Sequence, residues 1–452
     1  MTPTDLDELL ACPRCDAPLA STADGHRCAA CKVDFPRLDG LPFLFAEPEA
    51  ALGEWQARLH LELRRLEARA ASLDDELQST ELQVLTRQRM EQLRAACLDQ
   101  ASRLRSLLAP LLQTSPAARE TYLALRTRLP IDQGLNTYYQ NIHRDWGWGE
   151  TENLASCELV SSMLPAQPGK MLVLGAGAGR LAYDLHTTTS PELTVGLDFN
   201  PLLLATARRV SAGEPVDLWE FPIAPRHLAD QAVLNRLSAQ PAPQGLQFVL
   251  ADALRAPFRP GCFDTVVTPW LLDILPADLT EVTSRINRLL RPGGCWVNFG
   301  SLAFAAVKSA QCYSLEETLA LVEAAGFGKP VYREDEIPYM CSPASRHGRR
   351  ECVVTFSAEK RQDVVQPARH QALPDWLVTG QQAVPALREF QLQAASTRIF
   401  AFVMGMIDGK RSIRDMAMLM EQQRLMSRQE AEPTIRQFLI RMYDDSRREG
   451  SS

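Results

Sequence analysis

A cluster of glycines follows a hydrophobic run near the middle of the chain, and an acid follows the next hydrophobic run. The glycines are Gly175, Gly177 and Gly179, after the apolar segment Met171–Leu174, and the acid is Asp198. Glycines let a backbone turn tightly and approach a ligand closely, while an acid at the tip of a strand can accept hydrogen bonds from ribose hydroxyls. The pattern predicts a nucleotide-type cofactor site, with a purely structural strand-to-helix turn as the alternative.

The spacing of these glycines indicates which cofactor to expect. A pyrophosphate site prefers the pattern G-x-G-x-x-G, and Arg180 stands where its last glycine would fall. The sequence also lacks the G-x-x-x-x-G-K-[ST] phosphate loop. We therefore expect a cofactor without phosphates, S-adenosylmethionine (SAM), and we count Arg180 among the residues of its site.

Strands and helices alternate beyond the glycine cluster. Strands are expected at 246–252, 262–268 and 295–300, and a helix at 278–290. The alternation predicts a doubly wound, Rossmann-like α/β fold, in which a parallel sheet binds its ligand at the carboxyl edge of the strands. Asp252 ends one of these strands and would lie at the same edge as Asp198, so both are predicted to bind the cofactor.

This order of elements resembles the class I SAM-dependent methyltransferases. Over roughly residues 135–358 it is similar to the carnosine N-methyltransferase family, through Arg144-Asp-Trp, Leu-Gly-Ala-Gly-Ala-Gly-Arg-Leu-Ala-Tyr-Asp and Trp-Val-Asn-Phe-Gly. The resemblance implies an N-methyltransferase in which Arg144 contacts the cofactor. It also implies a contact at Asn141, where the family has glutamine, and it carries over the loop glycines and both acids.

Asp273 follows the fourth strand, where the resemblance implies an acid that faces the imidazole of the substrate. A carboxylate bonded to one ring N–H would fix the tautomer and stabilise the positive charge that develops as the other nitrogen is methylated. Asp273 is therefore the predicted catalytic residue. The alternative is that Asp273 only caps the helix that follows it.

The chain departs from the family where the substrate would bind. Residues 300–306 contain no histidine and residues 346–352 contain no tyrosine, although the family has substrate-binding residues of these types there. Four charged residues of the second segment could instead bind an acidic acceptor, or could form a solvated loop: Arg346, His347, Arg349 and Arg350. We expect a histidine-type nitrogen of a peptide or small molecule as the methyl acceptor. Methylation of oxygen or sulfur in a small metabolite, and a non-catalytic SAM-binding scaffold or peptide-binding protein, remain as alternatives.

The N-terminus carries a second motif with its own chemistry. Two C-x2-C pairs, Cys12 with Cys15 and Cys28 with Cys31, flank a short loop. Four thiolates at this spacing predict a closed, tetrahedral and therefore structural Zn²⁺ site, rather than a redox or disulfide role. The nearby His26 is expected at the surface and not as a further ligand.

The sequences around these cysteines resemble the small zinc-ribbon activators of methyltransferases, through Leu9-Leu-Ala-Cys-Pro-Arg-Cys and Phe35-Pro-Arg-Leu-Asp-Gly-Leu-Pro-Phe-Leu. The resemblance implies a ribbon that covers a hydrophobic surface of the enzyme, or alternatively one that binds substrate. The remaining domains are then predicted in chain order: zinc ribbon 1–47, helical hairpin or coiled coil 48–130, methyltransferase domain 131–358, linker 359–394 and a C-terminal domain 395–452.

Leucines at four-three spacing from Leu59 to Leu77 predict packed helices, and their phase slips near residue 80. We also consider a homodimer formed through the helices of residues 49–128. In the last domain, Asp408-Gly-Lys-Arg-Ser-Ile-Arg-Asp-Met-Ala is similar to PqqD-like winged-helix domains, which clasp leader peptides. A generic winged helix or a packing appendage fits this short motif equally well.

Composition sets outer bounds on function. The chain has 452 residues and a net charge of −7, which gives no electrostatic footprint for nucleic acid. No segment resembles a signal peptide, and no apolar run reaches membrane-spanning length. Of eleven cysteines, the seven outside the C-x2-C pairs show no disulfide framework. We therefore expect a cytoplasmic protein without a membrane or nucleic-acid partner.

Overall fold

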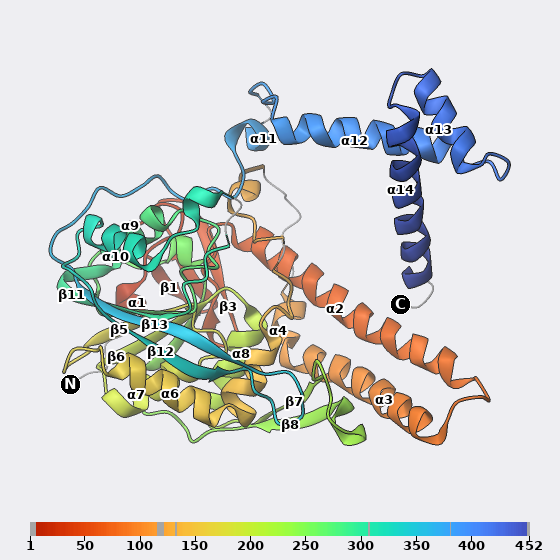
Figure 1. Cartoon of the computed structure of the whole chain (residues 1–452). Coiled ribbons are helices and arrows are strands. Elements are labelled where there is room, and N and C mark those ends of the chain that lie inside the picture. The colour runs from red at the N-terminus through yellow and green to blue at the C-terminus, as the bar shows by residue number, and fades with distance from the viewer. Residues whose placement is uncertain (1–5, 115–121, 132, 306–307, 380, 450–452) are drawn as a thin grey trace. The chain divides into compact units, whose positions relative to one another are not determined.

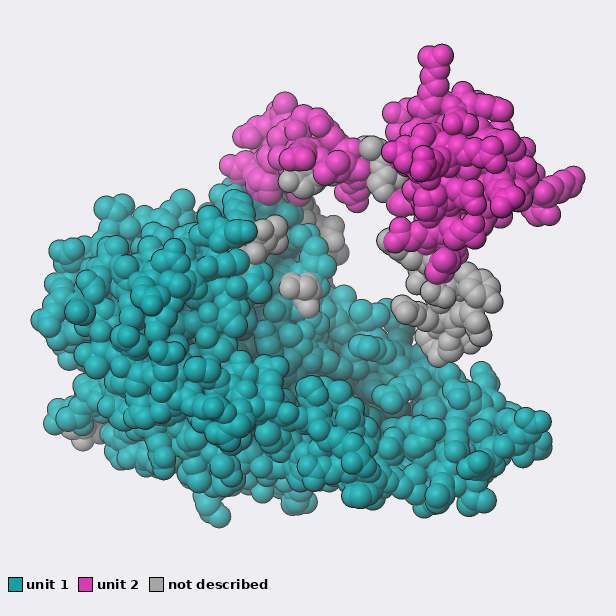
Figure 2. All heavy atoms as spheres, viewed as in Figure 1, with its two compact units in different colours: residues 1–373 teal, residues 374–452 magenta. Residues whose placement is uncertain are grey.

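The computed structural model describes residues 6–114, 122–131, 133–305, 308–379 and 381–449 of the chain. The chain divides into two compact units, at residues 1–373 and 374–452 (Figure 2).

A seven-stranded sheet forms the centre of the first unit, with the strand order β12-β13-β11-β10-β5-β6-β9 (Figure 1). The parallel strands are β5 (Lys170–Leu174), β6 (Leu193–Asp198), β9 (Leu246–Leu250), β10 (Phe263–Pro269) and β11 (Leu290–Gly300). Two antiparallel strands extend one edge, namely β12 (Val331–Tyr339) and β13 (Arg349–Glu359). This arrangement confirms the predicted α/β fold.

Helices pack on both faces of the sheet. On one face lie α6 (Glu150–Ser161), α7 (Arg180–Thr189) and α8 (Pro201–Ser211), and on the other α9 (Leu279–Leu289) and α10 (Leu315–Ala324) (Figure 1). Strand β5 shows why two cores form. Met171 and Val173 belong to the core of the first face, whereas Leu172 and Leu174 belong to that of the second. Side chains alternate across a strand, so an uninterrupted apolar run supplies both faces.

The N-terminal ribbon packs on the free edge of this sheet. Its elements are α1 (Leu6–Leu9), β1 (Ala20–Thr22), β2 (Gly25–Cys28), β3 (Val33–Leu38) and β4 (Leu41–Pro42). Just beyond β4, Phe43 forms a parallel bridge to Leu250 of β9, and the N–H of Leu44 donates to the carbonyl of Leu250 over 2.8 Å. The segment thus pairs backbone groups that edge strand β9 would otherwise expose.

A helical hairpin follows the ribbon, formed by α2 (Pro48–Leu77) and α3 (Val84–Leu107), with the short α4 (Ala109–Gln113) after it. Residues 78–83 separate the two long helices, which agrees with the slip in leucine phase near residue 80. Helix α3 packs on an inserted hairpin, β7 (Val216–Glu220) and β8 (Val233–Leu237), that the sequence analysis did not foresee. A buried bond from Gln100 Nε2 to Tyr139 Oη, 2.8 Å long, ties α3 to the methyltransferase core. The homodimer through these helices stays a prediction.

Short elements complete the first unit. They are η1 (Tyr122–Thr127), α5 (Tyr139–His143), the π-helix η2 (Arg144–Trp148), η3 (Leu228–Gln231), η4 (Ala253–Arg255) and η5 (Ser309–Gln311). Among the described residues, no helix is both long enough and apolar enough to cross a membrane.

The regular elements described in the second unit are all helices. Its helices are α11 (Asp375–Thr379), α12 (Arg388–Gly405), α13 (Ile413–Gln422) and α14 (Arg428–Glu449). A small core that includes Val403, Met416 and Ile435 holds α12, α13 and α14 together. Ser412 caps α13 in a capping box with Asp415, so part of the PqqD-like motif starts this helix. The strands that would make a wing are absent from the described residues of 374–449.

Candidate functional site

A cavity of about 580 Å³ opens at the carboxyl ends of the parallel strands in the first unit. This volume falls in the range typical of small-molecule sites, and the position is the one at which doubly wound sheets bind ligands. The cavity brings together most of the site residues predicted from the sequence. Those that line it are Asn141, Arg144, Gly175, Gly177, Asp198, Asp252 and Asp273.

The glycine loop turns in the left-handed region, with φ of +56° at Gly177 and +86° at Gly179. The two glycines have different reasons to lack a side chain. A Cβ on Gly177 would meet no atom within 4 Å, so this residue leaves open space at the cavity wall. A Cβ on Gly179 would lie 2.7 Å from Cβ of Ala207, so this residue lets α7 pack closely on α8. Gly179 does not line the cavity.

Two buried carboxylates lie beside the loop. Asp198 accepts hydrogen bonds from the N–H groups of Gly177 and Asn200, each over 2.9 Å. Burial nevertheless raises the pKa of Asp198 to about 6. Asp252 accepts from the N–H of Leu254 over 2.8 Å, and burial raises its pKa too. Carboxylates desolvated in this way gain from ligand hydroxyl or amino donors.

The segment that carries Arg144 folds as a π-helix against the glycine loop. Nε of Arg144 donates to Asp145 over 2.7 Å, and an Nη atom donates to Glu152 over 2.8 Å. Trp146 donates from Nε1 to the carbonyl of Ala178 over 2.7 Å. The Arg-Asp-Trp motif and the glycine loop therefore form one structure, although they lie far apart in the chain.

Arg180 does not line the cavity. Its Nε donates to both oxygens of Asp184 over 2.8 Å, and an Nη atom donates to the carbonyl of Asp145 over 2.9 Å. Its guanidinium also lies 5.6 Å from the ring centroid of Trp146. Arg180 thus contacts Asp145 and Trp146 of the π-helix and supports that segment. Its contact with the cofactor stays a prediction.

Asp273 lies in the loop after β10 and lines the cavity. The helix that follows is capped by Asp278, whose carboxylate accepts from the N–H of Thr280 over 2.9 Å. Asp273 instead accepts from the N–H of Ala303 over 2.8 Å and from the hydroxyl of Ser301 over 3.3 Å, both through Oδ2. The capping alternative is therefore wrong, while the catalytic role stays a prediction.

Two aromatic residues, Trp270 and Tyr339, line the same cavity as Asp273. Trp270 has a φ of +50°, rare for a residue of its size, and its ring centroid lies 4.8 Å from that of Tyr339. The N–H of Trp270 donates to the carbonyl of Phe299 over 2.7 Å, which fixes this conformation. Tyr339 ends β12, so a search for a substrate tyrosine in residues 346–352 alone misses it. Residues 331–339 carry no alternating apolar pattern that could have placed it.

Residues 370–372 line the cavity together with residues 126–130, and the N–H of Ala372 donates to the carbonyl of Arg126 over 2.7 Å. The sequence analysis assigned residues 359–394 to a linker. In the structure, the part before residue 373 belongs to the first unit and crosses one side of the site. We call residues 366–372 the strap.

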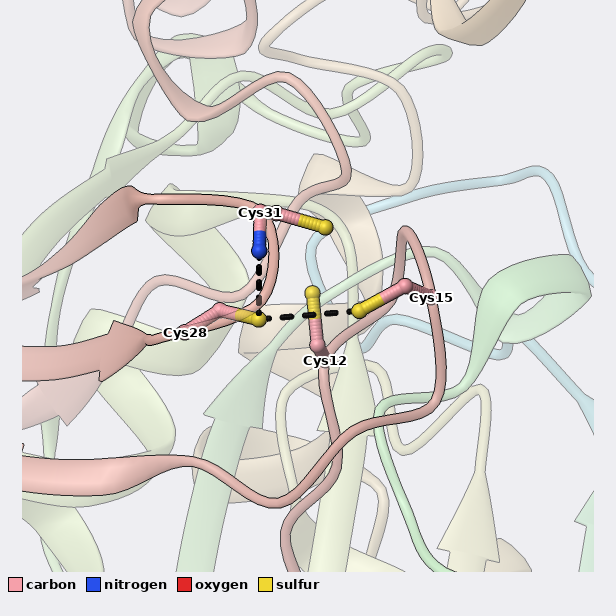
Figure 3. Close-up of side chains that lie close together, drawn as sticks. All are labelled: Cys12, Cys15, Cys28 and Cys31. Atoms are coloured by element: carbon pink, nitrogen blue, oxygen red, sulfur yellow. Dashed lines mark hydrogen bonds between the residues drawn. The ribbon is translucent and has the colours of Figure 1, made fainter.

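The four cysteines of the ribbon come together as predicted from their spacing (Figure 3). Their sulfur atoms, from Cys12, Cys15, Cys28 and Cys31, all lie within 4.8 Å of one another. A Zn–S bond length of about 2.3 Å places tetrahedral ligands roughly 3.8 Å apart, and the sulfurs of Cys15 and Cys28 are 3.6 Å apart. The N–H of Cys31 points at the sulfur of Cys28 over 3.3 Å, which favours a thiolate there. The donor set fits Zn²⁺ in a structural role.

The expectation for His26 is wrong in one respect. Its side chain is buried, 1% exposed, and Nε2 lies 2.8 Å from a carboxylate oxygen of Asp7. This contact joins α1, which carries Asp7, to strand β2, which carries His26, inside the ribbon.

Comparison with known proteins finds a methyltransferase domain in the chain. Residues 172–297 match the model of the family described as "Methyltransferase domain". The demethylmenaquinone methyltransferase of Thermus thermophilus is 28% identical over 135 residues, which are 30% of this chain and 48% of that protein. The chain thus spans about half the length of this curated relative.

Two of the solved structures that match this chain are described as methyltransferases. A SAM-dependent methyltransferase from Methanosarcina mazei is 15% identical, with a TM-score of 0.32 over 45% of this chain and 98% of that one. Phosphoethanolamine N-methyltransferase 2 of Haemonchus contortus, in complex with S-adenosyl-L-methionine, is 16% identical, with a TM-score of 0.32 over 55% of this chain and 61% of that one. The family match, the parallel sheet and the loop define a class I SAM-dependent methyltransferase domain within this chain.

Proposed function

We propose that the protein is an N-methyltransferase that moves the methyl group of SAM to an imidazole-type nitrogen of a histidine-containing peptide or small molecule. The observation that carries the proposal is that one cavity is lined both by the two cofactor acids and by Asp273. The carnosine N-methyltransferase resemblance supports an imidazole acceptor, although the family's histidine is missing from residues 300–306.

When bound, SAM supplies a methyl group on a positively charged sulfur, and transfer to a nucleophile is an in-line displacement. Such a reaction depends mainly on how the two partners are positioned. Gly177 leaves space at the wall, and Asp198 and Asp252 offer carboxylate acceptors. Arg144 is paired with Asp145 and Glu152, so it holds the π-helix side of the cavity in place.

Asp273 would act on the acceptor. Its Oδ2 is used by Ala303 and Ser301, and Oδ1 accepts no bond from a described residue. A ring N–H could donate to Oδ1, which would turn the other nitrogen's lone pair towards the methyl group and stabilise the cation that forms. The ring proton would leave through this carboxylate or to water after transfer.

The peptide form of the acceptor is supported by the PqqD-like motif at residues 408–417, which partly forms the start of α13. Zinc would hold the ribbon, and the ribbon pairs with edge strand β9.

The test is release of S-adenosylhomocysteine (SAH) by zinc-replete protein with carnosine, free histidine and histidine-containing peptides. We expect turnover with at least one imidazole, and loss of it when both ring nitrogens of that acceptor carry methyl groups. SAM binding without turnover on any imidazole would reject the proposal. Turnover with a hydroxyl or thiol metabolite would then favour an O- or S-methyltransferase, and none at all a SAM-binding scaffold.

A further inference from the structure

The charged segment 346–350 offers four candidates for contact with an acceptor, and the structure separates them. Only Arg349 lines the cavity. Arg346 donates to the carbonyl of Arg226 over 2.9 Å, and Arg350 forms an ion pair with Glu336. Arg349 and Arg350 are neighbours on β13, so their side chains point to opposite faces of the sheet.

Arg349 packs against the aromatic pair of Trp270 and Tyr339. With Asp273, this pair lines what we call the acceptor end of the cavity. Its guanidinium lies 4.7 Å from the ring centroid of Tyr339, its partner residue across β12 and β13, and Tyr339 in turn packs on Trp270. Nε of Arg349 donates to Glu351 over 2.7 Å. Its two Nη groups make no hydrogen bond to a described residue, so a fork of donors remains for a ligand.

The charges around this fork fit an anion. Asp145 of the π-helix and Glu152 of α6 are both paired with Arg144. Glu351 is paired with Arg349 itself and does not line the cavity. The acceptor end therefore offers the carboxylate of Asp273 for a ring N–H and the guanidinium of Arg349 for a negative group.

We infer that Arg349 is a specificity-determining residue that binds a carboxylate of the acceptor, so that the substrate class is an imidazole bearing a carboxylate. This inference rests on the proposed function. It explains how the chain can hold such an acceptor without the family's histidine at 300–306 and tyrosines at 346–352.

The experiment compares two ligands that differ by one carboxylate, imidazole-4-acetate and 4-methylimidazole. Each is titrated by calorimetry into full-length, SAH-loaded protein at about pH 8, where the ring is neutral. We expect roughly tenfold tighter binding of the carboxylate, as for a charge-assisted bond at a partly exposed site. Arg349→Gln should remove the preference and Arg349→Lys should restore part of it. Arg350→Gln, on the next residue of the same strand, should leave it unchanged.

Equal binding of the two ligands by the unaltered protein, or equal loss in Arg350→Gln and Arg349→Gln, would overturn the inference. A parallel SAH-release assay separates this outcome from failure of the proposed function. If the preference is present and no imidazole is methylated, carboxylate recognition stands and the imidazole N-methyltransferase proposal fails. If both ligands are methylated with equal KM, that proposal stands and the role of Arg349 is rejected.

Discussion

The two ends of the cavity are built by different means. At the cofactor end, the lining comes from the glycine turn after β5 and from carboxylates at the carboxyl ends of β6 and β9. These three strands are neighbours in the sheet. At the acceptor end, the lining comes from side chains of the β10 loop and of the antiparallel pair β12 and β13. Backbone geometry fixes the first end and side-chain stacking the second, so single substitutions should impair one end and spare the other.

The largest effect is expected at the cofactor end. Asp198→Ala removes a buried acceptor that lies 2.9 Å from the N–H of Gly177 and lines the cavity. We expect the affinity for SAH to fall roughly a hundredfold or more, since each lost charged hydrogen bond is worth about 1.5–3 kcal/mol. Calorimetric titration of SAH measures it. Circular dichroism must show a folded variant, and near-normal affinity in such a variant would contradict the assignment.

The matching change at the acceptor end is Asp273→Asn, which keeps the size of the side chain. We expect kcat to fall roughly a hundredfold, within the range usual for a positioned acid or base, while the Kd for SAH changes less than about twofold. Ser301→Ala is the control, because it removes only the weaker 3.3 Å bond to Asp273. An unchanged kcat in Asp273→Asn would show that the carboxylate merely holds the loop at Ala303.

The ribbon is predicted to depend on its metal. Cys28→Ser with Cys31→Ser removes two of the four clustered thiolates. Zinc content should be lost, and Tm should fall by roughly 5–10 °C if the lost site contributes several kcal/mol. Cys312→Ser, at an exposed cysteine outside the cluster, should change neither value. Full zinc content in the double variant would reject the site.

Cofactor affinity should also depend on pH through Asp198. Its pKa is raised to about 6, so the carboxylate that would accept ribose hydroxyls is present above pH 6 and is lost as the pH falls through it. We expect the affinity for SAH to drop below pH 6 by at most about tenfold per unit. The stability of the ligand-free protein depends on pH in the opposite direction. The stability linked to this group is complete below the ordinary pKa of 3.8 and is lost as the pH rises through about 6.

Asp198→Asn is the control for this titration, because it keeps the shape of the side chain but cannot ionise. The pKa of Asp184 is also raised to about 6 by burial, and its carboxylate is paired with Arg180. If the affinity for SAH still falls below pH 6 in Asp198→Asn, the effect therefore belongs to Asp184 or another group.

The sequence predicts the cofactor end of the cavity better than the acceptor end. Gly177, Asp198 and Asp252 could be placed because each lies at or just beyond the end of a strand whose apolar run is visible in the sequence. Tyr339 was not foreseen, and Arg349 was one of four candidates, because their meeting depends on the register of β12 with β13 and on the left-handed turn at Trp270. The hairpin β7–β8 was missed because its strands are short and follow no expected motif. Local patterns predict the cofactor end, whereas long-range pairing sets the acceptor end.

The smallest effect concerns the strap, which joins the ribbon to the cofactor end. Asp16, next to Cys15 of the cysteine cluster, forms 2.9 Å ion pairs with Arg288 of α9 and Arg369 of the strap. The carbonyl of the next residue, His370, accepts a bond from Nε of Arg255 over 3.0 Å beside the cavity. We expect Asp16→Ala to weaken SAH binding by up to about fivefold, the scale of a partly exposed ion pair.

Asp34→Ala is the matched control, because Asp34 is in the same ribbon and, among the described residues, pairs only with the exposed Arg27 over 3.2 Å. A loss of SAH affinity in Asp16→Ala alone would show that the strap transmits the state of the ribbon to the cofactor end. An equal loss in both variants would instead indicate general weakening of the ribbon. No loss in either would mean that the strap is held at the cavity by Arg255 and by the bond between Ala372 and Arg126, without help from the zinc site.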